Sequence, residues 1–393
     1  MRYASRKCPI CDHDQVDVLH SQKFALPEGH PLTDRYDVVC CLNCGFVYAD
    51  TAIPQEAYDR FYAQYSKYED AKTGTGGVEN LWDKQRQVET AQQIGSYLNN
   101  RSASVLDVGC ANGGLLKALK EIGYENVYGI DPSPVCVENT RKLGIDAEIG
   151  SLFKPLTRGQ FDCIVLSHTL EHVQDLKQAA QWIRAVLKEN GCLYIEVPDA
   201  SRYADLVDAP FQDFNTEHIN HFSLNSLQNY LKSNGLTPLK WGAKIIPASV
   251  NKPYPAIYCF AIKTEGSYDV VKDDELRPLI EKYIMASRQI LNDIETRLSS
   301  RLSKSNRVIV WGTGQLAMKL LIETSLSKAE IVAFVDSNPI NQGKTLNGVQ
   351  VIAPELIVGF TEPILISSTL HQQSIIDQIQ KMGLNNPLIL LKD

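Results

Sequence analysis

The sequence predicts an α/β protein in which a small zinc-binding domain precedes two Rossmann-like domains, the second smaller than the first. Three patterns lead to this prediction. Two short cysteine pairs, Cys8-Pro-Ile-Cys11 and Cys41-Leu-Asn-Cys44, stand near the N-terminus. Further along, a strand, a glycine-rich turn, a helix and a second strand follow one another at 104–131 and again at 307–336. That order is typical of parallel sheets covered by helices.

Length and composition are those of a globular protein with several domains. The chain has 393 residues, 44% of them apolar and 22% charged. It is longer than the chains that usually fold around a single hydrophobic core. Its net charge of −7 and its lack of Lys/Arg runs give no electrostatic reason to bind nucleic acid. No apolar run approaches about 20 residues, and the N-terminus lacks the hydrophobic core of a signal peptide. We therefore expect a soluble cytoplasmic protein without a membrane partner, whose ten cysteines serve thiol or metal chemistry.

The first domain, expected over residues 1–55, is built around the two cysteine pairs. Two CxxC turns suit a tetrahedral zinc ion, with Zn–S distances of about 2.3 Å. We expect one structural zinc ion on the four cysteines of these pairs: Cys8, Cys11, Cys41 and Cys44. The metal compensates for a segment too short to bury a core of its own. Three neighbours are rival ligands: Cys40, His13 and His20.

The second domain, expected over residues 56–265, contains a nucleotide-binding βαβ unit. The strand Val105 to Val108 runs into the turn GCANGG at 109–114, and the next strand ends at Asp131. Glycines let the backbone approach a ligand where a Cβ would collide. An acid about twenty residues past the turn is placed to hydrogen-bond a ribose diol.

The order of residues in this turn distinguishes between cofactors. A dinucleotide site has GxGxxG, whereas here the order is DVGCANG from Asp107 to Gly113. This pattern resembles motif I of class I S-adenosylmethionine methyltransferases, in which the acid lies near the methionine amino group. FDCIVLSHTLEHV at 161–173 and GCLYIEVP at 191–198 resemble the fourth and fifth strands of that fold. The resemblance implies eight cofactor-binding residues: Asp107, Gly109, Cys110, Gly113, Asp131, Ser151, Leu152 and His168. A Rossmann-like domain without a nucleotide is the alternative.

A helical linker and a smaller Rossmann-like domain are expected after residue 265. Within the linker 266–306, apolar residues recur at helical spacing after an acidic start, which predicts one long helix. Residues 307–393 then repeat the strand–turn–helix order, with GTGQLA in the turn and Asp336 after the second strand. Taken alone this pattern is a dinucleotide fingerprint, so NAD is an alternative ligand. Because the segment is too short for a catalytic domain, we expect it to hold the nucleotide end of a substrate.

The order of the parts narrows the resemblance further. A cysteine-rich domain, a methyltransferase domain, a Glu-His pair and a small Rossmann-like domain with VDSNPINQGK resemble the sugar C-methyltransferases that act on nucleotide-linked deoxysugars. In these enzymes the histidine of the pair is the candidate base that removes a proton from the carbon beside a keto group. The resemblance implies that His218 is the base here, that Glu217 orients it, and that the substrate is a nucleotide-linked (keto)deoxysugar.

Four residues are expected to contact the substrate: Tyr65, Tyr68, Asn215 and His221. The tyrosines precede the glycine-rich stretch 74–77, and together these segments have the composition of an aromatic lid that excludes water. A solvated helix with incidental tyrosines is the alternative. The other two stand where the family often carries aromatic residues, which leaves a hydroxyl as an alternative acceptor to a carbon acid.

The cluster Glu217, His218 and His221 also has two other interpretations. It is a metal site if another carboxylate joins it, since only an i, i+3 pair aligns on a helix and the three residues do not converge on an extended strand. It is otherwise the ordinary chemistry of a helix start. The whole chain likewise has two alternative functions, an O- or N-methyltransferase on a sugar, glycan or natural-product precursor, or a non-catalytic nucleotide-sugar binding protein.

Overall fold

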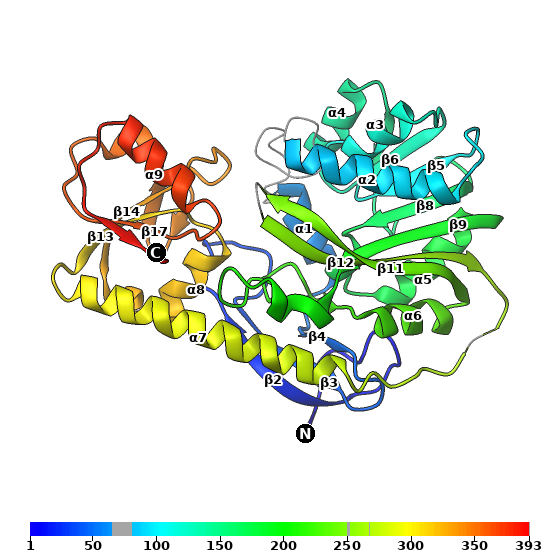
Figure 1. Ribbon diagram of the computed structural model, residues 1–393, viewed down its shortest axis with the longest axis horizontal. Coiled ribbons are helices and arrows are strands. Elements are labelled where there is room, and N and C mark those ends of the chain that lie inside the picture. Colours follow the sequence, from blue (N-terminus) through cyan, green and yellow to red (C-terminus); the bar gives the residue numbers. More distant parts are fainter. Residues whose placement is uncertain (65–80, 250–251, 267, 393) are drawn as a thin grey trace. The chain divides into compact units, whose positions relative to one another are not determined.

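The computed structural model describes residues 1–64, 81–249, 252–266 and 268–392 (Figure 1). The chain forms two compact units, each assembled from segments that are distant in sequence. The larger unit combines Met1–Leu19, Val38–Leu206 and Glu217–Ile280, and the smaller combines His20–Asp37, Val207–Thr216 and Glu281–Asp393. The N-terminal segment thus contributes to both units, and the expected boundaries at residues 55, 265 and 306 stay predictions.

The N-terminal segment contributes four strands to a five-stranded sheet, which has the order β1-β2-β3-β4-β10. Its strands are β1 (Arg2–Tyr3), β2 (Gln15–Lys23), β3 (Arg35–Cys41), β4 (Val47–Asp50) and β10 (Asn220–His221). β10 comes from far along the chain and pairs antiparallel with β4, with Asn220 opposite Tyr48 and His221 opposite Val47. The stretch that contains Glu217 and His218 is therefore fixed on its C-terminal side by this sheet.

A seven-stranded sheet forms the core of the larger unit, in the order β11-β12-β9-β8-β5-β6-β7. Neighbours from β9 to β7 pair in parallel, and β12 and β11 continue the sheet antiparallel. The strands are β5 (Val105–Val108), β6 (Val127–Asp131), β7 (Asp146–Ile149), β8 (Phe161–Ser167), β9 (Leu187–Pro198), β11 (Leu236–Ser249) and β12 (Lys252–Lys263). The strands expected on either side of the glycine turn are confirmed as β5 and β6. β8 lies in the stretch 161–173 and β9 contains the stretch 191–198, the two that resemble the fourth and fifth strands of the methyltransferase fold.

Helices cover both faces of this sheet (Figure 1), which is why its central strands are almost uniformly apolar. The helices include α1 (Gln55–Gln64), α2 (Leu81–Tyr97), α3 (Gly114–Glu121), α4 (Pro134–Lys142), α5 (Leu176–Val186) and α6 (Leu224–Ser233), with 3-10 helices η2 (Leu170–His172) and η3 (Ala200–Asp205). Val105 of β5 belongs to the core that contains Ala91 and Leu119, whereas Leu106 belongs to the core that contains Ile183. Successive residues of one strand thus serve opposite layers.

The smaller unit contains a second, mostly parallel sheet in the order β15-β16-β14-β13-β17-β18. The long helix α7 (Leu276–Leu302) precedes it, as the helical spacing predicts. The remaining elements are β13 (Arg307–Trp311), α8 (Gln315–Glu323), η4 (Ser325–Lys328), β14 (Glu330–Val335), β15 (Thr345–Leu346), β16 (Val349–Ile352), η5 (Pro354–Ile357), β17 (Ile364–Ile366), α9 (Gln372–Lys381) and β18 (Leu388–Leu390). Within the described ranges, no helix has the length and apolar character that a bilayer span requires.

Candidate active site

A cavity of about 400 Å³ opens at the carboxyl ends of β5, β6 and β8. Ligands of open parallel sheets bind at this edge, and the volume lies in the range of small-molecule sites. Seven of the eight residues expected to bind the cofactor line it: Asp107, Gly109, Cys110, Asp131, Ser151, Leu152 and His168. The eighth, Gly113, lies outside the lining.

The glycines of the turn have conformations that other residues rarely adopt. Gly109 has a φ of +78° and Gly113 a φ of +77°. A Cβ on Gly109 would come within 3.1 Å of the Thr169 hydroxyl, and one on Gly113 would come within 2.9 Å of Thr140. Gly113 therefore shapes the turn and starts α3, while Gly109 gives the cavity its open floor.

Two buried carboxylates stand on the neighbouring strands β5 and β6, Asp107 one residue before the end of β5 and Asp131 at the end of β6. Asp131 accepts hydrogen bonds from the backbone N–H groups of Ser133 (2.8 Å) and Ala111 (2.9 Å), which ties the end of β6 to the glycine turn. Burial raises the pKa of Asp131 to about 6 against these two bonds. Burial and the nearby charge of Asp131 raise the pKa of Asp107 to about 7. A ligand that offers a cation and a pair of hydroxyl donors would stabilise the ionised forms of Asp107 and Asp131.

His168 lines the cavity with both ring nitrogens held by carboxylates. Its Nδ1 lies 3.2 Å from Oε1 of Glu171, and its Nε2 lies 3.2 Å from Oε1 of Glu196. Burial lowers the pKa of His168, but these two hydrogen bonds outweigh it and leave the pKa above its ordinary value. His168 is therefore protonated more readily than an ordinary histidine. Glu196 is paired on its other oxygen with Lys244.

Glu217 and His218 lie in the loop before β10, and of the two only His218 lines the cavity. The His218 ring packs edge-to-face on His172, with centroids 4.9 Å apart. Nδ1 of His172 lies 3.1 Å from the backbone carbonyl of Glu217, and the Tyr62 hydroxyl donates to Oε2 of Glu217 at 3.5 Å. The interpretation of this stretch as a helix start is wrong, because α6 begins at Leu224 and has its own N-cap.

Of the four residues expected to bind the substrate, the structure describes His221 and Asn215. His221 is fully buried in β10, where its Nδ1 lies 3.5 Å from the Tyr203 hydroxyl. Burial, with a smaller contribution from the charge of Arg6, lowers the pKa of His221 to about 3. Asn215 belongs to the smaller unit. The other two, Tyr65 and Tyr68, lie outside the described residues, as does the glycine stretch 74–77.

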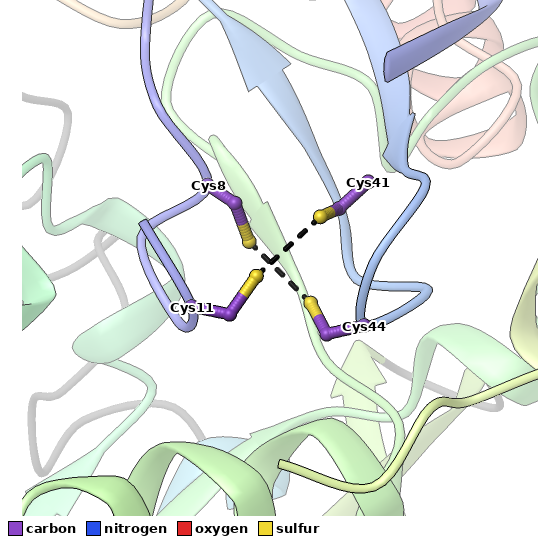
Figure 2. A group of neighbouring side chains, drawn as sticks. All are labelled: Cys8, Cys11, Cys41 and Cys44. Atoms are coloured by element: carbon purple, nitrogen blue, oxygen red, sulfur yellow. Dashed lines mark hydrogen bonds between the residues drawn. The ribbon is translucent and has the colours of Figure 1, made fainter. Parts of the chain in front are cut away.

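Figure 2 shows the four cysteines of the N-terminal pairs with their sulfur atoms converging on one point. Cys8 and Cys44 are 3.5 Å apart at Sγ, as are Cys11 and Cys41, and all four sulfurs lie within 4.8 Å of one another. Tetrahedral zinc with bonds of about 2.3 Å requires S···S distances of about 3.8 Å. The cluster therefore fits a zinc ion with small adjustments.

The rival ligands do not belong to this cluster. Cys40 points its thiol toward the backbone carbonyl of Gly45, and His20 stacks on Phe211 in the smaller unit with ring centroids 4.2 Å apart. His13 is absent from the group of converging ligand atoms among the described residues.

Two functional candidates, Glu171 and Glu196, were missed by the sequence reasoning. Glu171 lines the cavity with His168 and His172, and Glu196 anchors His168 although it lies in the middle of an apolar strand. A glutamate inside the apolar run YIEVP is an available signal, because a charged side chain is rarely fully buried without a partner. The sequence around its partner, Lys244 on β11, does not indicate this pairing.

In the smaller unit, the acid that follows the glycine turn already accepts hydrogen bonds from the protein, whereas a dinucleotide site needs this acid for the ribose. Asp336 accepts four hydrogen bonds from its own loops, through the backbone N–H groups of Thr313 and Asn338, the Thr313 hydroxyl and the Asn341 amide. A carboxylate offers about four acceptor positions, so this one has little capacity left for a ribose diol.

Comparison with known proteins assigns a chemistry to the part of the chain that forms this cavity. Residues 82–240 match the family model described as a methyltransferase domain, a range that contains both carboxylates, the glycine turn and the HTLEHV segment. The chain carries an S-adenosylmethionine-dependent methyltransferase domain. Residues 304–390 match a second family model, described as C2185-like, N-terminal. A search of curated proteins found no match.

Solved structures of methyltransferases resemble part of the chain. An S-adenosylmethionine-dependent methyltransferase from Clostridium acetobutylicum is 15% identical, with a TM-score of 0.38 over 46% of this chain and 92% of its own. The 1,6-didemethyltoxoflavin-N1-methyltransferase from Burkholderia thailandensis is 19% identical, with a TM-score of 0.40 over 57% of this chain and 98% of its own. At these TM-scores the structural likeness carries no argument about the acceptor.

Proposed function

We propose that the enzyme transfers a methyl group from S-adenosylmethionine to a carbon of a nucleotide-linked (keto)deoxysugar, with His218 as the general base. The observation that carries the proposal is that His218 lines the same cavity as Asp107 and Asp131. In this proposal the two carboxylates bind the cofactor's amino group and ribose, and the histidine meets the acceptor. Methyl donor and proton acceptor then face one space.

The chemistry needs one proton acceptor and good alignment. A carbon beside a keto group loses its proton to the imidazole, and the resulting electron pair attacks the methyl group in line with the departing sulfur. S-adenosylhomocysteine leaves, and the imidazolium later gives its proton to solvent. An imidazole has about the right pKa for this step near neutral pH, and alignment of nucleophile, methyl and sulfur supplies much of the rate.

Glu217 supports His218 by position in this proposal. Its backbone carbonyl accepts a hydrogen bond from His172, and its carboxylate accepts one from Tyr62. These contacts come from η2 and α1, so they hold the loop before β10 from two sides. Glu217 is outside the cavity lining and acts as a positioning residue.

The N-terminal cysteine cluster and the smaller unit complete the proposal. We assign a structural zinc ion to the four cysteines, because four thiolates leave no open coordination position for chemistry. We assign the substrate's nucleotide to the smaller Rossmann-like unit. NAD is not part of the proposal, since Asp336 is already saturated by its own loops.

Isotope exchange separates C-methylation from its alternatives. The enzyme is incubated in D₂O with nucleotide-linked keto sugars and S-adenosylhomocysteine, and loss of the proton beside the keto group is followed by NMR. A carbon-directed base predicts exchange in the wild type and little in His218→Ala. Methyl transfer to a hydroxyl or an amine without any exchange would replace the proposal by the O- or N-methyltransferase alternative. Absence of any methyl transfer across a panel of keto and hydroxy sugars would contradict it altogether.

A further inference from the structure

Three polar side chains meet on the wall of the methyltransferase cavity without a role in cofactor binding. Glu171 and His172 come from η2, and His218 comes from the loop before β10. One ligand atom of each lies within 4.8 Å of the corresponding atoms of the other two, and all three residues line the cavity. Glu171 is 1% exposed. Two imidazoles and one carboxylate are the donor set of many divalent transition-metal sites.

The hydrogen bond made by His172 fixes which of its nitrogens faces the cluster. Its Nδ1 lies 3.1 Å from the backbone carbonyl of Glu217, and a carbonyl oxygen can only accept. Nδ1 therefore carries the proton, and in the neutral ring the lone pair is on Nε2. Metal-binding histidines are commonly held in this way, with the second nitrogen donating to a backbone carbonyl.

This arrangement turns two acceptors toward each other. Nε2 of His172 lies 3.9 Å from Oε1 of Glu171, and a lone pair facing a carboxylate requires a cation or a proton between them. Oε2 of Glu171 is buried and has no hydrogen-bond partner within the described ranges. Oε1 is likewise among the buried atoms without a hydrogen-bond partner, although Nδ1 of His168 lies 3.2 Å from it.

The distance between the ligand atoms of His172 and Glu171 is close to that of two ligands on one metal ion. Tetrahedral zinc with Zn–N and Zn–O distances of about 2.0–2.1 Å places its ligand atoms about 3.3–3.4 Å apart. The separation of 3.9 Å between His172 and Glu171 is slightly longer than this value. Rotation of one side chain is enough to close the difference. Three protein ligands leave at least one coordination position open toward the cavity.

We propose that Glu171, His172 and His218 form a binding site for a divalent transition metal ion, separate from the cysteine cluster. The ligands are nitrogen and oxygen atoms, which favours zinc, cobalt, nickel or iron(II) over the oxygen-preferring magnesium and calcium ions.

Occupancy of this site has a consequence that rests on the function proposed above. A metal ion on His218 uses the lone pair that would otherwise remove the acceptor's proton. The metal-bound enzyme should therefore transfer methyl groups more slowly than the enzyme with an empty site, and a chelator that spares the cysteine zinc should restore the rate.

Cobalt(II) is a direct probe that does not depend on activity. The full-length protein, with zinc kept in the cysteine cluster, is titrated with Co²⁺ and followed by calorimetry and visible absorption. We expect one equivalent to bind, with the weak d–d bands of nitrogen and oxygen ligands and without the strong charge-transfer bands of thiolates. Glu171→Gln and His172→Asn remove a ligand, so they should weaken this binding by at least the roughly 10- to 100-fold that loss of a partner outside the ligand set costs. Asp59→Asn, which changes a cavity carboxylate outside the set, should leave it unchanged.

The outcomes separate this inference from the proposed function. Absence of the cobalt equivalent in the wild type overturns the metal site, whatever the variants do, and leaves the isotope-exchange test of His218 untouched. Equal cobalt binding in the wild type and Glu171→Gln also overturns it. Cobalt binding that raises methyl transfer overturns the inhibitory consequence together with the role of His218 as base.

Discussion

Asp131 offers the sharpest test of the cofactor site, because one carboxylate performs two tasks. Its oxygens accept hydrogen bonds from the backbone of Ser133 and Ala111, and it lines the cavity where a ribose diol is expected. Asp131→Ala removes the ribose contact and loosens the glycine turn. Asp131→Asn keeps the size but turns an amide donor toward a backbone N–H group. Both variants should therefore lose cofactor affinity.

The expected loss follows from the charge on the acceptor. A hydrogen bond to a charged group contributes about 1.5–3 kcal/mol, which corresponds to about 10- to 150-fold in affinity. Loosening of the turn adds to this value for Asp131→Ala.

The stability of the unbound protein should change in the opposite sense to the cofactor affinity. Burial raises the folded-state pKa of Asp131 from 3.8 to about 6, so ionisation of this group costs the wild type stability as pH rises through that interval. The alanine variant lacks that cost.

Calorimetric titration with S-adenosylmethionine and S-adenosylhomocysteine measures the affinity. The matched control is Asp146→Ala, which removes an exposed carboxylate from the adjacent strand β7, where it pairs with Arg158 on the surface. The control should bind both ligands as the wild type does. An Asp131→Ala affinity within twofold of the wild type would refute the assignment of this cavity to the cofactor.

Three further predictions concern pH, zinc and His221. Because Asp107 has a pKa of about 7 in the unbound protein and a cationic ligand favours its ionised form, cofactor affinity should fall as pH drops below 7 and level off above 8 in calorimetry at several pH values. Cys8→Ser should abolish stoichiometric zinc in elemental analysis and lower the unfolding temperature by at least about 5 °C; full zinc content would contradict the cluster. His221→Asn, buried outside the cavity, should retain more turnover than His218→Asn, and equal inactivation would contradict that placement.

Much of the fold follows from local patterns in the sequence. The strand and turn around Gly109 are predictable because apolar runs, glycines and a following acid lie within thirty residues of each other. The cysteine cluster is predictable because ligand spacing within each pair is local. The division into units is not, since the smaller unit gathers His20–Asp37 and Val207–Thr216 with Glu281–Asp393, and no local pattern in the sequence marks these segments as one unit.

The candidate site shows the same limit. His168 was expected to contact the cofactor, but its charge state depends on Glu196, which lies on the next strand and reaches it through β-sheet register. The meeting of Glu171 and His172 with His218 depends on the same long-range packing. The sequence analysis identified each histidine, but it could not identify which of them line the same side of the cavity.

The most direct test of the central claim compares His218→Ala with the wild type in methyl transfer and in cofactor binding. Loss of a positioned proton acceptor should lower turnover by about 10²–10⁴-fold. Cofactor affinity should barely change, because His218 lies in the loop before β10 and not in the glycine turn. Near-normal turnover in His218→Ala, with the cofactor still bound, would contradict the account.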